Sequence, residues 1–156
     1  MTLTMARPRL RDHLRTRANR KTPMGLFSWL FGIVPIAGNI DGPGFFDVEV
    51  MGESNYLRAI AKARGGASAG ESIVTTATLL LEDDNPHDKQ AVRVDVGGRT
   101  IGYLDRDNAR AYRKELSRNG HAKLTCTCTA KIIGGKRRPD GTQGLFGALL
   151  DLPTNG

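Results

Sequence analysis

Six stretches of the chain have the pattern of β-strands, because they alternate apolar and polar residues or are rich in β-branched residues. Glycine, proline or polar turns separate them. They are FDVEVMG (46–52), ESIVTTATLLLE (71–82), AVRVDV (91–96), RTIGYL (99–104), HAKLTCTCTAKIIGG (121–135) and LFGALLDLP (145–153). Gly97-Gly98 separates the third and fourth stretches, which is the length and composition of a tight hairpin turn.

The period changes to that of a helix between the fourth and fifth strands. This segment runs from a capping Asp105 to a terminating Gly120 and has apolar residues at helical spacing. A shorter segment, 55–66, predicts a short helix or turn after the first strand. About six strands with one clear helix between the fourth and fifth predict a mainly β (α+β) fold, a small and partly open β-barrel.

The chain has 156 residues and a formal net charge of +7, and its composition is that of a soluble, globular protein with one domain. Most of the excess charge lies in residues 1–24. We therefore predict a basic and apolar leader over 1–46, which is flexible, and a folded domain over 47–153. An Arg-rich arm is typical of contact with nucleic acid or anionic lipid. It is equally consistent with a solvated leader, or with translation that starts at Met24.

The most apolar stretch is GLFSWLFGIVPIAGNI (25–40), behind the basic arm. It is shorter than the roughly 20 residues of a membrane-spanning helix and contains Pro35. A basic segment before an apolar one also resembles a signal peptide, but no clear cleavage site follows. An interfacial anchor or a segment docked on the domain remain as alternatives. We expect a cytoplasmic protein.

The cysteines and the absence of catalytic motifs bear on whether the protein binds a metal or catalyses a reaction. Cys126 and Cys128 are two apart on one predicted strand, where they pair poorly, and no second Cys/His cluster accompanies them. We expect reduced thiols, no metal and no other cofactor. His87 and Asp88 are sequence neighbours, which rarely form a catalytic pair, and the chain contains neither a nucleophile elbow nor a phosphate-binding loop. We therefore expect a binding module and no enzyme.

The candidate chemistry is that of single-stranded nucleic acid, which proteins hold with aromatic faces and with cations on the backbone. The candidate faces are His87, Tyr103, Tyr56 and Phe146, and the candidate cations include Arg106 and Arg110, with Arg113 and the loop 136–138. Asp88 stands among these cations, where a carboxylate can accept a sugar hydroxyl at a chain end. Each residue also has a structural alternative: a capped turn for Asp88, a surface loop for His87, core positions for Tyr103 and Phe146, and a solvated helix face for the arginines.

The chain contains two motifs in order, Asn85-Pro86-x-Asp88-x-x-Ala91-Val92 and Gly102-Tyr103-Leu104. The helix and a glycine-flanked final strand follow them. In this order of features, residues 46–153 resemble the HIRAN domain family. The resemblance implies an OB-like β-barrel that binds single-stranded DNA, especially a free 3′ end. It also implies DNA repair or replication-fork processing, alongside a helicase or nuclease activity on another chain.

The resemblance implies roles for particular residues. His87 stacks on the terminal base, Asp88 accepts the terminal hydroxyl, and Tyr103, Arg106 and Phe146 supply a polar ring, a phosphate cation and the rest of the platform. The family carries an Arg-aromatic pair after the first strand, where this chain has Ser54 and Asn55, with Tyr56 one place later. This departure, and histidine as a weaker stacking surface, predict a lower affinity or a barrel that no longer binds DNA ends.

The rival interpretation is a non-catalytic interaction or membrane-surface protein that docks through residues 25–40. It requires Phe27, Trp29 and Phe31 to be exposed together, whereas DNA binding requires Arg106 and an aromatic floor around Asp88.

Overall fold

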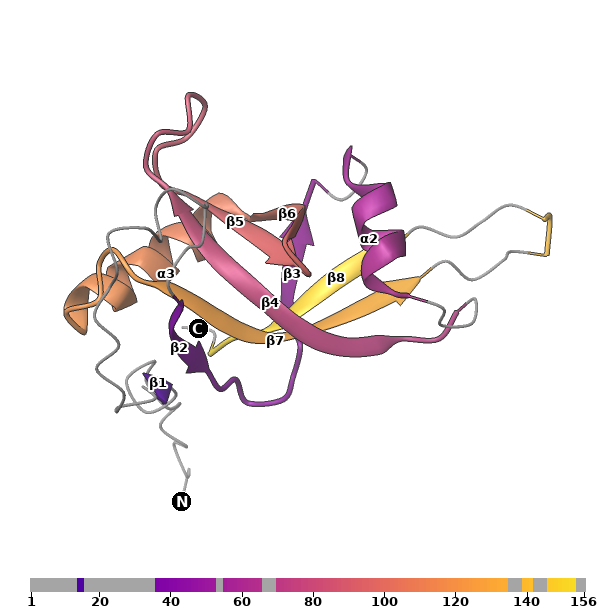
Figure 1. The fold of residues 1–156 in the computed structure, drawn as a ribbon, viewed down its shortest axis with the longest axis horizontal. Helices are drawn as coiled ribbons and strands as arrows, with labels where there is room; N and C mark the ends of the chain where they lie inside the picture. Colours follow the sequence, from indigo (N-terminus) through magenta and orange to yellow (C-terminus); the bar gives the residue numbers. More distant parts are fainter. Residues whose placement is uncertain are drawn as a thin grey trace, which may run out of the picture.

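The computed structural model (Figure 1) describes residues 14–15, 36–52, 55–65, 70–134, 139–141 and 146–153. Within these residues the elements are β1 (Leu14–Arg15), β2 (Ile36–Ile40), β3 (Val48–Met51), α2 (Leu57–Ala63), β4 (Ile73–Glu82), β5 (Ala91–Val96), β6 (Arg99–Leu104), α3 (Arg106–Arg118), β7 (Thr125–Gly134) and β8 (Phe146–Asp151).

Six of these strands form a closed barrel, which confirms the predicted mainly β fold. The order around the ring is β7-β4-β5-β6-β3-β8, and β8 pairs with β7 to close it. All the pairings within the ring are antiparallel. The hairpin between β5 and β6 turns at Gly97 and Gly98, as predicted, and both glycines have positive φ.

The structure also places residues 36–40, assigned to the leader by the sequence analysis, in the sheet. They form β2, which runs parallel to the first part of β7 from Thr125 to Cys128. The edge of β7 is open there, because β8 pairs with it only from Thr129 onward. Ile40 is fully buried, so this segment contributes to the core. The aromatic residues of the apolar stretch, Phe27, Trp29 and Phe31, lie outside the described residues.

The barrel interior is filled from alternating positions of its strands. Val48 and Val50 of β3 and Val92 and Val94 of β5 point inward and are almost completely buried. Cys126 and Cys128 are free and buried. Burial raises the pKa of both thiols, to about 12 for Cys128, so they stay protonated as small core residues.

Helix α3 begins and packs as its sequence predicts. Its N-cap Asp105 accepts hydrogen bonds from the backbone N–H groups of Asp107 and Asn108. Ala109, Tyr112 and Leu116 form its buried face. In Figure 1 α3 lies at the left of the barrel, close to the loop between β4 and β5, whereas α2 lies to the right and contacts β6 and β8. Neither helix has the length and apolarity that a bilayer crossing requires.

Candidate nucleic-acid interface

The loop between β4 and β5 contains the Asn85-Pro86-His87-Asp88 turn, and its own side chains hold its shape. Asn85 Oδ1 accepts hydrogen bonds from the backbone N–H of His87 at 2.9 Å and of Asp88 at 3.3 Å. Asp88 Oδ1 accepts from the backbone N–H of Gln90 at 2.9 Å. Asn and Asp side chains bond the backbone two or three residues on in just such turns. The structural alternative for Asp88 is therefore present, and it occupies one carboxylate oxygen.

The second oxygen of Asp88 faces the start of α3. Asp88 Oδ2 lies 3.9 Å from Nε of Arg106, which is too long for a hydrogen bond but within ion-pair range. The side chain of Asp88 is 24% exposed and that of Arg106 is 75% exposed. The fold thus brings a carboxylate oxygen that accepts no described hydrogen bond close to an exposed cation, and these two residues are 18 positions apart in the sequence.

Beside this pair lies an open hollow of about 550 Å³. Its lining consists of Leu81, Glu82, Asp83, Asp84, Asn85, Pro86, His87 and Tyr103. This lining combines an aromatic ring, a histidine and three carboxylates, and it contains no Lys or Arg. Asp88 follows the lining residue His87 directly in the chain and lies 3.9 Å from Arg106, but neither Asp88 nor Arg106 is part of the lining. Such a surface suits an uncharged aromatic group, and it repels phosphate from its acidic side.

The floor of the interface is a row of paired residues on the outer face of the barrel. Tyr103 of β6 pairs with Arg93 of β5 on one side and with Met51 of β3 on the other. Directly paired residues of antiparallel strands present their side chains on the same face. Met51 is 49% exposed, and the ring of Tyr56 lies 6.3 Å from that of Tyr103, with the planes tilted by 51°. Tyr103 is therefore a half-buried surface ring and no core residue.

The surroundings of Tyr103 also control its ionisation. Burial, followed by hydrogen bonding to Tyr56 and the negative charge of Glu82, raises the pKa of Tyr103 from 10.0 to about 12. The phenol is therefore neutral throughout the physiological range.

Tyr103→Phe is expected to flatten the loss of stability at high pH. Because the folded pKa lies above the unfolded one, the contribution of Tyr103 is fully present below pH 10 and is lost as pH rises through about 12. Urea unfolding of the wild type and of the variant at several pH values in this window measures the difference. Tyr112 titrates alike in both proteins. Parallel stability profiles from pH 9 to pH 12 would contradict the assignment.

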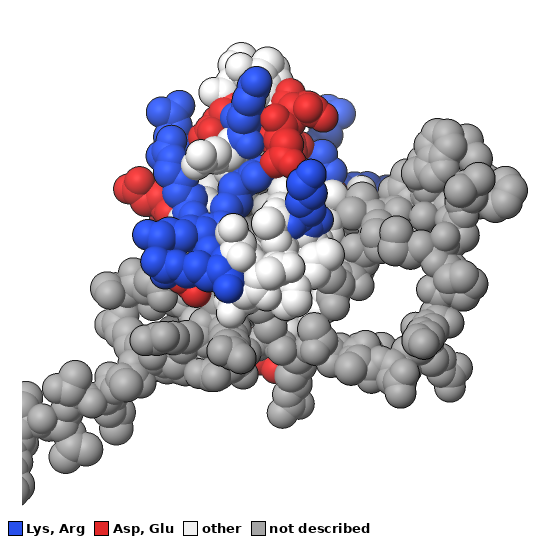
Figure 2. Space-filling view, turned by 90° about the vertical axis from the view of Figure 1, so that its left-hand side faces the viewer, with Lys and Arg blue, Asp and Glu red and all other residues white. Residues whose placement is uncertain are grey.

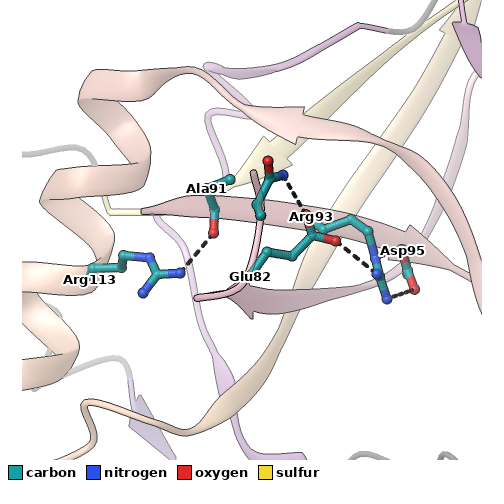
Figure 3. A network of polar contacts seen from close by, with 6 residues as sticks. Glu82, Ala91, Arg93, Asp95 and Arg113 are labelled. Atoms are coloured by element: carbon teal, nitrogen blue, oxygen red, sulfur yellow. Dashed lines mark hydrogen bonds and ion pairs between the residues drawn. The ribbon is translucent and has the colours of Figure 1, made fainter. Parts of the chain in front are cut away.

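A second set of polar residues, which the sequence analysis missed, neutralises the cation next to Tyr103 (Figure 3). Arg93 Nη1 donates to Glu82 Oε1 at 2.8 Å, and Nε and Nη2 donate to the carboxylate of Asp95 at 3.0 and 3.2 Å. Asp95 is almost buried, so Arg93 is bound within the fold and is not free for a phosphate. The alternation in AVRVDV was the available signal, because it puts Arg93 and Asp95 on one face.

Arg113, read from the sequence as part of a surface stripe, instead holds α3 to the loop. Its Nη1 forms an ion pair with Asp83 at 2.6 Å. Its Nη2 donates to the carbonyl oxygen of Ala91 at 2.9 Å, as Figure 3 shows. The side chain is only 18% exposed. These contacts fix the position of α3, and hence of Arg106, relative to the turn.

The remaining candidate residues of the interface do not line the hollow. Asn55 and Arg110 are exposed. Tyr56 and Phe146 are half-buried and pack against the core, and the guanidinium of Arg64 lies 5.6 Å from the centre of the Phe146 ring. Neither Phe146 nor Arg110 lines the hollow. The structure therefore brings together His87, Asp88, Tyr103, Tyr56 and Arg106, while Phe146 belongs to the neighbouring surface at α2. Ser54 lies outside the described residues.

Comparison with known proteins gives a match to one protein family. The family described as the HIRAN domain matches residues 43–133, which is more than half of the chain. Among solved structures, the crystal structure of the HIRAN domain of human HLTF is similar, with a TM-score of 0.34 and 14% sequence identity over 66% of this chain and 70% of that chain. No curated protein matches the chain.

The matched residues contain every feature of the interface except Phe146: the strand β3, the Asn85–Asp88 turn, the row through Tyr103, and the start of α3. The chain belongs to the HIRAN domain family, which is known generally as a family of DNA-binding modules.

Proposed function

We propose that this domain binds the 3′-terminal nucleotide of single-stranded DNA in the hollow beside the β4–β5 loop. It acts as a non-catalytic module, and any cleavage or unwinding of the DNA is carried out by another chain, such as a nuclease or helicase. On this proposal the domain serves in DNA repair or in the processing of replication forks.

The observation that carries the proposal is the pairing of Asp88 with Arg106 at the edge of an aromatic hollow without cations. A DNA chain that ends in the hollow puts its last base and sugar there and its first phosphate outside. The base needs an aromatic face, the free hydroxyl needs an acceptor, and the phosphate needs a cation. Tyr103 of β6, Asp88 of the β4–β5 loop and Arg106 at the start of α3 supply these three groups.

The acidic lining explains why an end is favoured over the middle of a strand. Glu82, Asp83 and Asp84 line the hollow on the side of the loop. Glu82 and Asp83 are paired with Arg93 and Arg113, whereas Asp84 forms no ion pair with a residue that the structure describes. A strand that continued past the hollow would therefore bring phosphate against the charge of Asp84. A terminal nucleoside carries no further phosphate and avoids this repulsion. For the same reason a 3′-phosphate is expected to weaken binding.

Asp88→Asn is expected to reduce the preference for a free 3′-hydroxyl over a 3′-phosphate by about tenfold. The amide oxygen of asparagine can still accept from the Gln90 N–H, so the turn is kept, but its charge and its second acceptor oxygen are lost. Fluorescence anisotropy on the full chain, with labelled oligothymidylates that differ only in the 3′ group, measures the ratio of the two dissociation constants.

Asp107→Asn is the matched control, because Asp107 is an exposed carboxylate on α3 outside the lining of the hollow. It should leave the preference unchanged. Equal affinity of the wild type for both oligonucleotides would refute end recognition. If the two variants lost the 3′-hydroxyl preference equally, Asp88 would have only a general charge effect and no specific role.

A further inference from the structure

Four basic residues of α3 are spaced four positions apart and all are exposed: Arg106, Arg110, Lys114 and Arg118. We call them the α3 basic ridge. Side chains four apart on a helix lie on neighbouring turns. Each step along the ridge rises about 6 Å and rotates about 40° around the axis, because an α-helix has 3.6 residues per turn. The ridge therefore begins at Asp88 and winds onto the outer side of the helix.

The packing of α3 fixes where this ridge points. Ala109, Tyr112 and Leu116 are buried against the barrel, and Arg113 is tied to the loop. The helix therefore cannot roll to bury the ridge. Figure 2 looks onto the end of the molecule where α3 lies, and it shows Lys and Arg side chains gathered there, with acidic side chains above them toward the loop.

The members of the ridge differ in how far the fold already neutralises them. Arg118 Nη1 forms an ion pair with Glu115 at 2.7 Å, and Arg106 is 3.9 Å from Asp88. Arg110 and Lys114 form no ion pair with any residue that the structure describes. The deeper cations, Arg93 and Arg113, are both bound to carboxylates. Arg110 and Lys114 thus carry charges that no described ion pair neutralises, on a line that starts at the proposed binding site.

We propose that Arg110 and Lys114 bind the phosphates of the nucleotides that precede the 3′-terminal one, so that the strand leaves the hollow past Arg106 and runs along α3. This inference rests on the proposed function for its starting point. The exposed Asp84, which has no ion pair among the described residues, disfavours the opposite path over the loop by charge repulsion. The ridge contacts phosphates only, so it adds affinity and length dependence without reading bases.

The double variant Arg110→Gln/Lys114→Gln tests this in the full chain. The dissociation constant is measured for free 3′-hydroxyl oligothymidylates of about 4 and about 12 nucleotides, at several salt concentrations. The wild type should bind the longer strand more tightly, and the variant should lose most of that gain. Its slope of log affinity against log salt on the longer strand should be shallower by about 1.4, about 0.7 for each lost phosphate contact.

Lys62→Gln/Arg99→Gln is the matched control, since it also removes one exposed Lys and one exposed Arg, from α2 and from the β5–β6 hairpin. Retention of the length gain by the control and its loss by the ridge variant support the proposal. Equal effects of the two pairs would show a general charge effect and overturn it. The absence of any length gain in the wild type would also overturn it.

Two further experiments distinguish phosphate binding by the α3 basic ridge from end recognition in the hollow and from binding to a lipid surface. Asp88→Asn should lose the 3′-hydroxyl preference but keep the length gain, whereas the ridge variant should do the reverse. A wild type that shows the length gain without any 3′-hydroxyl preference would therefore count against the proposed function only. Phosphatidylserine vesicles should not compete with DNA; vesicle binding that requires Arg110 and Lys114 while DNA binding does not would overturn the proposal. No binding of any oligonucleotide by the wild type overturns both.

Discussion

Gly102→Ala is expected to lower the free energy of unfolding by about 3 kcal/mol, a fall of roughly 6–12 °C in Tm for a chain of this size. Gly102 lies in β6 directly before Tyr103, and its backbone passes very close to β3. A Cβ atom placed there would lie 2.5 Å from the carbonyl oxygen of Met51 and 2.5 Å from Cγ1 of Val50. Its φ of 153° is also a conformation that residues with a side chain rarely adopt.

The matched control is Gly98→Ala in the hairpin turn. Gly98 has a φ of 73°, but a Cβ atom there would meet no atom within 4 Å. This variant therefore carries the backbone strain without the steric contact, and we expect a loss of about 1 kcal/mol. Thermal and urea unfolding of both variants measure the difference. Equal losses at the two positions would show that β3 does not pack against Gly102 as described.

Tyr103→Ala is expected to weaken binding of a single strand with a free 3′ end by about tenfold to a hundredfold. The reason is the loss of the one ring that both lines the hollow and contacts Tyr56. Stacking of a base on an aromatic ring contributes about 1–3 kcal/mol. Tyr103 lies on the outer face of β6, so the substitution leaves the barrel interior unchanged. Anisotropy titrations at constant salt measure the effect.

Tyr103→Phe separates the ring from its hydroxyl. It keeps the stacking face and should weaken binding by less than about threefold, in contrast to the alanine variant. Equal losses in both variants would assign the role to the hydroxyl and remove stacking from the mechanism. No loss in either variant would place the terminal base elsewhere, and Phe146 beside Arg64 would then be the aromatic surface to examine next.

The arrangement of charges in this domain is consistent with the proposed path of the strand. The cations that position the site, Arg93 and Arg113, are bound to carboxylates and to a backbone carbonyl. Arg106, which faces Asp88, and Arg110, one turn further along α3, are exposed. The candidate site thus combines a hollow that has acidic residues in its lining with a helix that carries exposed basic residues. On the proposed function, this separation of charge favours a chain end over a continuous strand.

The local sequence pattern alone determined most of the strands and the helix α3. The strands β3 to β8, the hairpin at Gly97-Gly98 and the capped helix α3 were all predicted, because a period of two or of 3.6 residues and the residues that cap or turn the chain are properties of short segments. The Asn85–Asp88 turn was recognisable for the same reason, since Asn85 and Asp88 bond backbone groups only two or three residues away.

Only the tertiary structure decided which of these segments meet. The strand β2 forms because β7 is longer than the part that β8 covers, and nothing within residues 36–40 states this. Strand register and helix docking decide three contacts of the site: Tyr56 with Tyr103, Glu82 with Arg93, and the ion pair of Asp83 with Arg113. Residues far apart in the chain carry no local signal of their pairing. The sequence therefore pointed to candidate residues, and the packing of the barrel decided which of them lie together.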